Sequence, residues 1–271
     1  MSQGTMLEGK VVVVTGAGGG IGRDIALQCA AQGAKVVVND IGASVSGEGG
    51  DTGPAQKVVA EIQAAGGQAA ANTDSVAEVA AAGRIIQCAL DSFGRIDAVV
   101  NNASLFEHDT VADFSMQAME AHWRANTAPA ILLARALHTA LDGSGRTGCV
   151  VNLLDQKLWN PNPDYLSYTL SKAALQSATT LLAMALAPRV RVCGVAPGVT
   201  LLSGAMSEAE FTAAHRMTPL ARSSSAEDVA RAVHFLLESP AVTGSTLLVD
   251  GGQHLIGQPR DVMFLAREAK G

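Results

Sequence analysis

The stretch that most constrains the fold of this chain runs from Lys10 to Asp40. It begins with a short β-branched run, Val11 to Val14, which is typical of a strand buried in a parallel sheet. A glycine-rich turn at residues 15–22 ends that run, and apolar residues at helical spacing follow the turn. A second apolar run, Val36 to Val38, stops just before Asp40. The stretch therefore predicts a strand, a tight turn, a helix and a second strand that ends in an acid.

This order of elements is that of a dinucleotide-binding βαβ unit. Glycines let the backbone approach a pyrophosphate, and the start of the helix offers free N–H groups and the positive end of its dipole. A carboxylate at the tip of the second strand accepts hydrogen bonds from a ribose diol. We therefore expect the cofactor phosphates to lie against Gly16, Gly20, Ile21 and Gly22, and the adenosine ribose to lie against Asp40.

The rest of the chain repeats the alternation of strands and helices. Further strands are predicted at residues 68–73, 98–100, 148–154, 189–196 and 245–249. This alternation predicts an α/β fold, with a Rossmann-type, doubly wound, seven-stranded parallel sheet flanked by helices. The 271 residues suit one domain, 1–271, and we interpret about 199–218 as a substrate lid and the Gly- and Ser-rich residues 41–53 as a loop.

Composition excludes several kinds of partner. The net charge is −6 and no cluster of Lys and Arg occurs, which argues against a nucleic acid. No apolar run reaches the ~20 residues of a membrane helix, and the first ten residues lack a signal-peptide core. The four cysteines lack the spacing of metal ligands. We expect a cytoplasmic protein that binds a small-molecule substrate, with no metal, no membrane and no nucleic acid.

A tyrosine and a lysine, Tyr168 and Lys172, lie four residues apart in the helix predicted for residues 165–187. That spacing places both side chains on one face of the helix. An ammonium favours the phenolate, so we expect Lys172 to lower the pKa of Tyr168 from its ordinary value of about 10. Tyr168 could then exchange a proton near neutral pH while hydride moves to or from a nicotinamide. Tyr165 has no lysine four residues later, so it is assigned no such role.

The chain resembles the classical short-chain dehydrogenases/reductases along nearly its whole length. The resemblance rests on Thr-Gly-x-x-x-Gly-x-Gly at residues 15–22, on Asn-Asn-Ala at 101–103, on Asn126, on the Tyr-x-x-x-Lys pair and on Pro197-Gly198. It implies an NAD(P)-dependent oxidoreductase that assembles as a homotetramer, a dimer of dimers, through the helices of Asn126 and Tyr168.

The resemblance also implies roles for individual residues. Asn126 would be catalytic and hold a water that leads to Lys172. Asp74 would bond the adenine amino group, although it could equally cap a helix over residues 75–93. The further cofactor-binding residues that it implies are Ser75, Asn102, Ala103, Tyr168, Lys172, Pro197, Gly198 and Val199.

One departure from the family pattern bears on the substrate. Most members have a serine thirteen residues before the tyrosine, where this chain has Asp155. The pteridine, dihydromonapterin and dihydrofolate reductases of the superfamily resemble it in this exchange. Their turn, in which a serine contacts the pterin and a phenylalanine stacks on it, is similar to Ser104-Leu105-Phe106. We therefore expect a pteridine-like C=N substrate with Asp155 in the catalytic set, while Phe106 as an ordinary core residue remains open.

Two other functions remain open. One is a carbonyl or secondary-alcohol dehydrogenase acting, for example, on a 3-hydroxyacyl or keto substrate, and the other is a non-catalytic dinucleotide-sensing protein. The joint presence of Tyr168, Lys172 and Asn126 favours an enzyme. The carboxylate of Asp40 would repel a 2′-phosphate, so NAD(H) is expected, although pteridine reductases use NADPH and Arg23 could shift the preference to NADP(H).

Overall fold

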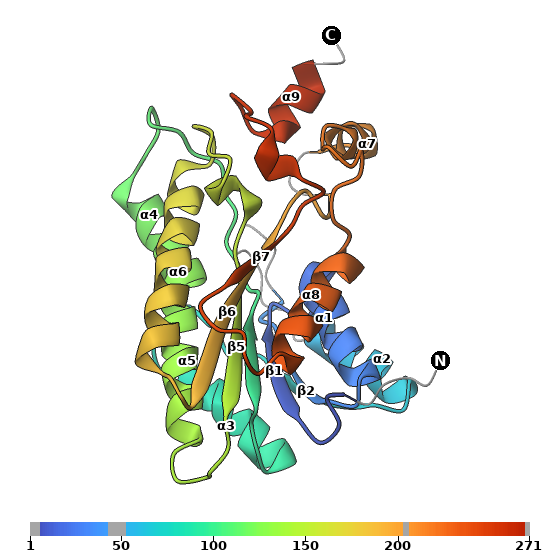
Figure 1. Ribbon diagram of the computed structural model, residues 1–271, viewed down its shortest axis with the longest axis vertical. Helices are drawn as coiled ribbons and strands as arrows, with labels where there is room; N and C mark the ends of the chain where they lie inside the picture. Colours follow the sequence, from blue (N-terminus) through green and yellow to red (C-terminus); the bar gives the residue numbers. More distant parts are fainter. Residues whose placement is uncertain (1–5, 43–52, 203–205, 269–271) are drawn as a thin grey trace.

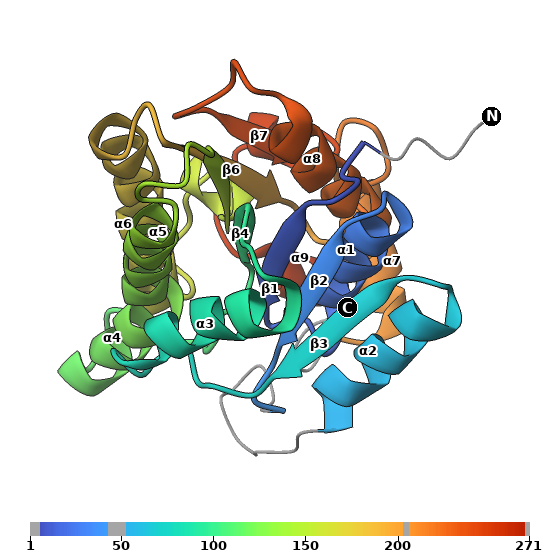
Figure 2. The ribbon, with the colours of Figure 1, turned by 90° about the horizontal axis from the view of Figure 1, so that it is seen from below.

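The computed structural model describes residues 6–42, 53–202 and 206–268. It forms a single Rossmann-type domain around a seven-stranded parallel sheet of order β3-β2-β1-β4-β5-β6-β7, as the sequence predicts. Helices cover both faces of the sheet (Figure 1 and Figure 2). The strands are β1 Val11–Thr15, β2 Lys35–Asn39, β3 Gln68–Asn72, β4 Ala98–Asn101, β5 Gly148–Leu153, β6 Val190–Pro197 and β7 Thr246–Val249.

The apolar run of β1 is explained by its central place in the sheet. Val12 and Val14 pack toward the face covered by α1, α2 and α8, whereas Val11 and Val13 pack toward the face covered by α3 and α5. Because both faces are buried, the strand needs no alternation of polar residues. The six helices that flank the sheet are α1 Gly20–Ala31, α2 Gly53–Ala64, α3 Ala81–Phe93, α5 Ala128–Ala140, α6 Leu166–Ala185 and α8 Ala226–Glu238.

The strand order places a crevice at the carboxyl end of β1. β1 pairs with β2 on one side and with β4 on the other, so the chain crosses the sheet between β3 and β4. Ligands of doubly wound sheets bind at this kind of switch point. The glycine turn after β1 and the turn after β4 therefore meet at the same place.

Asn126 lies in an interruption of its helix. Ser115 accepts a hydrogen bond from the Ala118 N–H and caps α4, Met116–His122. A π-helical turn, η1 Trp123–Thr127, follows, and α5 begins directly after it. The wider hydrogen-bond spacing of this turn places Asn126 in the interior.

The segments above the carboxyl ends of the strands close the molecule on one side. α7, Glu208–Arg216, lies in the segment interpreted as a lid, of which residues 203–205 fall outside the described part. α9, Val262–Glu268, packs against α7 beyond the sheet (Figure 1). Most of the predicted loop, residues 43–52, also falls outside the described ranges. Among the described residues, none of the helices has the length and apolar character to cross a membrane.

Candidate active site

The glycine turn after β1 packs backbone against backbone. Gly16 has φ +62°, and a Cβ on it would lie 2.8 Å from Ala103 Cα, so only glycine fits there. A Cβ on Gly22 would lie 2.1 Å from the carbonyl oxygen of Gly16. Asn102 closes the arrangement, because its Nδ2 donates to the carbonyl oxygens of Thr15 and Gly16 at 3.0 and 2.9 Å. The turn after β4 is therefore fixed to the turn after β1.

Asp40 lies beside this turn, as predicted. Its Oδ2 accepts the Gly18 N–H at 2.8 Å, and its Oδ1 accepts the Gly42 N–H at 2.7 Å. Gly19 is the N-cap of α1 and has no side chain, so no side chain of the described residues caps the first N–H groups of this helix. A glycine cradle at a helix start, with a fixed carboxylate at the neighbouring strand end, fits the pyrophosphate and ribose of a dinucleotide.

Arg23 and Asp74 each have partners of their own. The Arg23 guanidinium donates to both carboxylate oxygens of Glu61 and, at 3.2 Å, to Asp24. Asp74 accepts from Arg84 Nε at 2.5 Å. The alternative that Asp74 caps a helix over residues 75–93 is wrong, since α3 begins only at Ala81 and a turn carries the residues between.

Three of the expected catalytic residues meet at the carboxyl end of β5. Tyr168 Oη donates to Asp155 Oδ2 at 2.8 Å. Lys172 Nζ donates to the carbonyl oxygen of Leu153 at 2.8 Å and lies 5.7 Å from the centroid of the Tyr168 ring. Tyr168 and Lys172 are both buried, on the face of α6 that points to the sheet.

The electrostatics of this cluster differ from our expectation. Burial raises the pKa of Tyr168 well above its usual value, and the charge and hydrogen bond of Asp155 raise it further. Burial also lowers the pKa of Lys172 to about 8. The prediction that Lys172 lowers the pKa of Tyr168 is therefore wrong, because burial and the carboxyl at 2.8 Å dominate. Tyr168 holds its proton at neutral pH.

Asp155 itself is kept from ionising easily. Burial raises the pKa of its carboxyl. Hydrogen bonds from the Lys157 N–H and the Tyr168 hydroxyl favour the charged form and lower this pKa, but the effect of burial is larger. Its Oδ1 accepts the Lys157 N–H at 2.8 Å. The two oxygens of Asp155 thus connect the Tyr168 hydroxyl to the short turn η2, Gln156–Leu158.

Asn126 links the turn after β4 to α6. Its Nδ2 donates to the Leu105 carbonyl at 3.0 Å and to Ser171 Oγ at 2.9 Å, and its Oδ1 accepts the Leu105 N–H at 2.7 Å. Ser104 Oγ donates to Asn126 Oδ1 at 3.2 Å. The hydroxyl of Ser104 is therefore engaged by Asn126, and its predicted contact with substrate stays a prediction.

A cavity of about 240 Å³ opens next to Asp155 and Tyr168. Phe106 lines it and stacks on Tyr165, with ring centroids 4.3 Å apart and an interplanar angle of 11°. The cavity wall also contains, from the residues named so far, Ile21, Asp155, Gln156, Lys157, Tyr165, Tyr168, Pro197, Gly198 and Val199. Ile21, from the glycine turn, joins the dinucleotide cradle to this cavity.

Sequence reasoning missed part of this wall. Tyr165 lines the cavity and has φ +57°, a left-handed conformation that is uncommon for residues other than glycine. Lys157, Asp261 and Met263 also line it. These residues come together only in the folded chain, so no pattern in the sequence indicated them.

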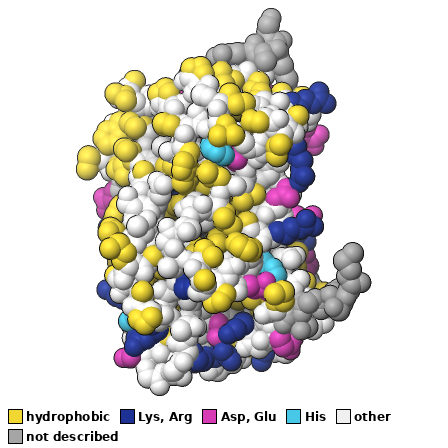
Figure 3. Space-filling model, in the orientation of Figure 1, with side chains coloured by type: hydrophobic (Ala, Val, Ile, Leu, Met, Phe, Trp, Pro, Cys, Tyr) yellow, Lys and Arg dark blue, Asp and Glu magenta, His cyan; other side chains and the backbone are white. Residues whose placement is uncertain are grey.

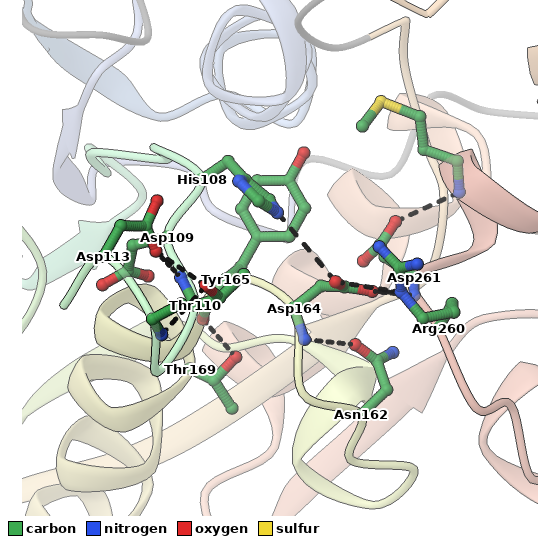
Figure 4. Close-up of polar contacts among 12 residues, drawn as sticks. His108, Asp109, Thr110, Asp113, Asn162, Asp164, Tyr165, Thr169, Arg260 and Asp261 are labelled. Carbon is green, nitrogen blue, oxygen red and sulfur yellow. Dashed lines mark hydrogen bonds and ion pairs between the residues drawn. The ribbon is translucent and has the colours of Figure 1, made fainter.

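The C-terminal segment reaches the cavity through Asp164. Its carboxylate accepts from Arg260 Nε at 2.9 and 3.1 Å and from the Asp261 N–H at 2.7 Å. Figure 4 shows these contacts, with Tyr165 beside them at the start of α6. His108 Nε2 lies 3.9 Å from the same carboxylate. Asp164 thereby fixes Asp261 and the beginning of α9 at the mouth of the site.

Comparisons with known proteins agree with this geometry. The family model described as enoyl-(acyl carrier protein) reductase matches residues 16–254. The 3-oxoacyl-(acyl-carrier-protein) reductase of Synechocystis sp. is 34% identical over 252 residues, which cover 92% of this chain and 98% of that protein. Nearly all of each protein therefore takes part in the match.

Two solved structures share the fold. FolM alternative dihydrofolate reductase 1 from Brucella canis, complexed with NADP, has a TM-score of 0.86 at 33% identity and covers 95% of this chain and 98% of its own. A 7α-hydroxysteroid dehydrogenase complexed with NADH and 7-oxo glycochenodeoxycholic acid has a TM-score of 0.83 at 31% identity, with 93% and 97% coverage. The chain thus has a nicotinamide dinucleotide cofactor and is an NAD(P)-dependent oxidoreductase of the short-chain dehydrogenase/reductase family.

Proposed function

We propose that this oxidoreductase reduces a pteridine-like C=N bond. The observation that carries the proposal is the 2.8 Å hydrogen bond from Tyr168 to Asp155, in a setting that raises the pKa of both groups. Such a pair is a phenolic proton donor backed by a carboxyl, which suits an acceptor nitrogen. The similarity to FolM alternative dihydrofolate reductase 1 supports the same substrate class.

The roles of the residues follow from their contacts. Tyr168 gives its proton to the ring nitrogen, and Asp155, bonded to the Tyr168 hydroxyl, returns a proton to it. The ammonium of Lys172, held at the Leu153 carbonyl, stabilises negative charge that develops on Tyr168. Asn126 fixes the turn after β4 and the start of α6 relative to each other. The bound nicotinamide supplies the hydride.

The cofactor would extend from the glycine turn to the cavity. Gly16, Gly20, Ile21 and Gly22 would hold its pyrophosphate, and Asp40 its adenosine ribose. Asp74, Ser75, Asn102 and Ala103 would lie along its nucleoside halves, and Tyr168, Lys172, Pro197, Gly198 and Val199 would lie at the cavity end. Phe106 would stack on the substrate ring with Ser104 nearby. Residues 199–218 would be the lid of one 1–271 domain, because Val199, Thr200, Leu201 and Met206 line the cavity.

A carbonyl or secondary-alcohol substrate is the second candidate. A protonated Tyr168 can also donate to a ketone oxygen, and the relatives include a 3-oxoacyl reductase and a 7α-hydroxysteroid dehydrogenase. The test is a spectrophotometric screen of cofactor oxidation against dihydropterins, dihydrofolate, diketones and 3-oxoacyl thioesters. Turnover of ketones without turnover of any dihydropterin would reject the C=N proposal.

For the cofactor we propose NAD(H). Asp40 is fixed by two backbone N–H groups beside Gly18, where a 2′-phosphate would add charge of the same sign. Arg23, the nearby cation considered for this phosphate, is paired with Glu61 and Asp24. Asp40→Ala should lower the NADH-over-NADPH ratio of kcat/KM about 10-fold or more. A wild type with higher kcat/KM for NADPH would contradict the proposal.

For assembly we propose a homotetramer. α6 exposes Leu170, Leu181 and Met184, and α4 and η1 expose Met116 and Trp123. Hydrophobic side chains gather at the upper left of Figure 3, where α4 and α6 lie in Figure 1. A patch of this kind on two adjacent helices suits a two-fold interface of more than roughly 1,000 Å². Light scattering should give four times the chain mass, and a monomer at micromolar concentration would reject it.

A further inference from the structure

Two residues directly after Asp155 contribute polar side chains to the wall of the substrate cavity. Gln156 and Lys157 belong to the turn η2, and both line the cavity. Gln156 is 8% exposed, and its Oε1 is buried and accepts no hydrogen bond from any described residue. A buried acceptor without a partner is costly, so its persistence at a cavity wall points to a ligand that supplies the missing donor.

Lys157 complements this acceptor with donors. Its side chain is 4% exposed, and its Nζ donates to Asp261 Oδ2 at 3.0 Å. The ammonium lies 5.2 Å from the centroid of the Tyr165 ring. An ammonium carries three N–H groups, and Asp261 is the one hydrogen-bond acceptor that the described residues offer it. Two donors therefore remain for a molecule in the cavity.

We propose that Gln156, Lys157 and Asp261 form a substrate subsite that recognises a cyclic amide edge, that is, a ring carbonyl next to a ring N–H. Lys157 donates to the carbonyl oxygen, and Gln156 Oε1 accepts the N–H. The inference rests on the proposed function and extends it from the reacting C=N bond to the edge of the ring that the enzyme reads. It names Gln156 and Lys157 as specificity-determining residues.

The charges of the subsite favour a neutral edge over a carboxylate. The positive charge of Lys157 is already balanced by Asp261 at 3.0 Å. A substrate carboxylate would lie next to Asp261 and Asp155, which would repel its negative charge. It would also place an acceptor opposite Gln156 Oε1, which needs a donor. A cyclic amide supplies both an acceptor and a donor, so it satisfies Lys157 and Gln156 together.

The subsite lies next to the two side chains that would transfer the proton, Asp155 and Tyr168. The backbone N–H of Lys157 bonds Asp155 Oδ1, while the Tyr168 hydroxyl bonds Asp155 Oδ2. In a 4-oxo-dihydropteridine the ring carbonyl lies beside the imine nitrogen that receives the proton. A ring whose nitrogen faces Tyr168 would therefore present its carbonyl on the side of Lys157.

The test is binding measured by isothermal titration calorimetry on the full chain, with NAD⁺ present and two probes. The first probe is pterin, the 2-amino-4-oxo ring, and the second is 2,4-diaminopteridine, which replaces the carbonyl with an amino donor. We expect Lys157→Met and Gln156→Leu each to weaken pterin binding about 10-fold or more and to weaken the diamino probe much less. Lys10→Met, at the opposite end of β1, should change neither Kd.

Folding of the variants is monitored separately. Lys157→Met leaves Asp261 without its cation, so the double variant Lys157→Met/Asp261→Asn removes the charge pair together. Each variant should retain the wild-type Kd for NADH, because the glycine cradle lies outside the subsite. A variant that loses NADH binding is replaced in the comparison by the double variant or by Gln156→Leu.

The outcomes separate the two proposals. Wild-type protein that neither binds nor reduces any pteridine would overturn the proposed function, and the subsite with it. Wild-type binding of pterin that Gln156→Leu and the Lys157 variants leave unchanged would overturn the subsite alone. If the variants weakened the binding of both probes equally, the subsite would also be overturned, because the carbonyl would then not be the group that it recognises.

Discussion

Replacing Tyr168 by Phe is expected to lower kcat/KM at least about 10³-fold for every substrate that the enzyme reduces. The substitution removes the hydroxyl that donates to Asp155 Oδ2 and would donate to the substrate. It keeps the ring, whose edge contacts Phe106 at a centroid distance of 4.7 Å. The loss should therefore appear in kcat, measured by cofactor oxidation at saturating substrate, with the Kd for NADH unchanged.

Tyr165→Phe is the matched control for this experiment. It makes the same chemical change three residues away in a ring that lines the same cavity. Burial raises the pKa of Tyr165 to about 12, so its hydroxyl keeps its proton and does not titrate at working pH. We expect kcat to change less than about 3-fold, since the stack on Phe106 remains. If Tyr168→Phe retained more than about a tenth of the activity, another group would have to be the proton donor.

The parts of the site that the sequence predicts are those encoded by local pattern. The glycine-rich residues 15–22 predict a tight turn between the first strand and the first helix, and this turn lies between β1 and α1. Asp40 directly follows β2, where the apolar run of the sequence stops. Parallel strands bring their carboxyl ends to one edge of the sheet, so Asp40 lies at the edge where ligands bind. Asn126, to which the family resemblance assigns a role, lies in the π-helical turn η1.

The parts that could not be predicted depend on contacts between distant segments. Asp164 and Arg260 are 96 positions apart, and nothing in either local pattern indicates that they pair. Their contact brings Asp261 to Lys157, so the polar wall of the cavity exists only in the folded chain. The helix spacing of Tyr168 and Lys172 was informative, but the direction of the Tyr168 pKa depends on burial, which the spacing does not encode.

The substitution that decides the substrate class is Asp155→Ser. We expect it to cut kcat/KM on a dihydropterin about 10²-fold or more, because the variant can no longer return a proton to Tyr168. A serine hydroxyl donates readily to a developing oxyanion, so turnover of simple ketones should rise. Asp155→Asn is the matched control: it keeps the size and an acceptor for the Tyr168 hydroxyl but supplies no proton, so it should lose dihydropterin turnover without gaining ketone turnover.

The pH profile gives an independent check on the same residue. Burial raises the pKa of the Asp155 carboxyl, so the acid form persists to higher pH than in an exposed aspartate. Reduction requires this acid form, so wild-type kcat/KM should be high below the raised pKa and should fall as pH increases through it. The Ser and Asn variants should lack this fall. If Asp155→Ser leaves dihydropterin turnover and its pH profile unchanged, the carboxyl takes no part in proton transfer and the carbonyl-reductase function replaces the C=N proposal.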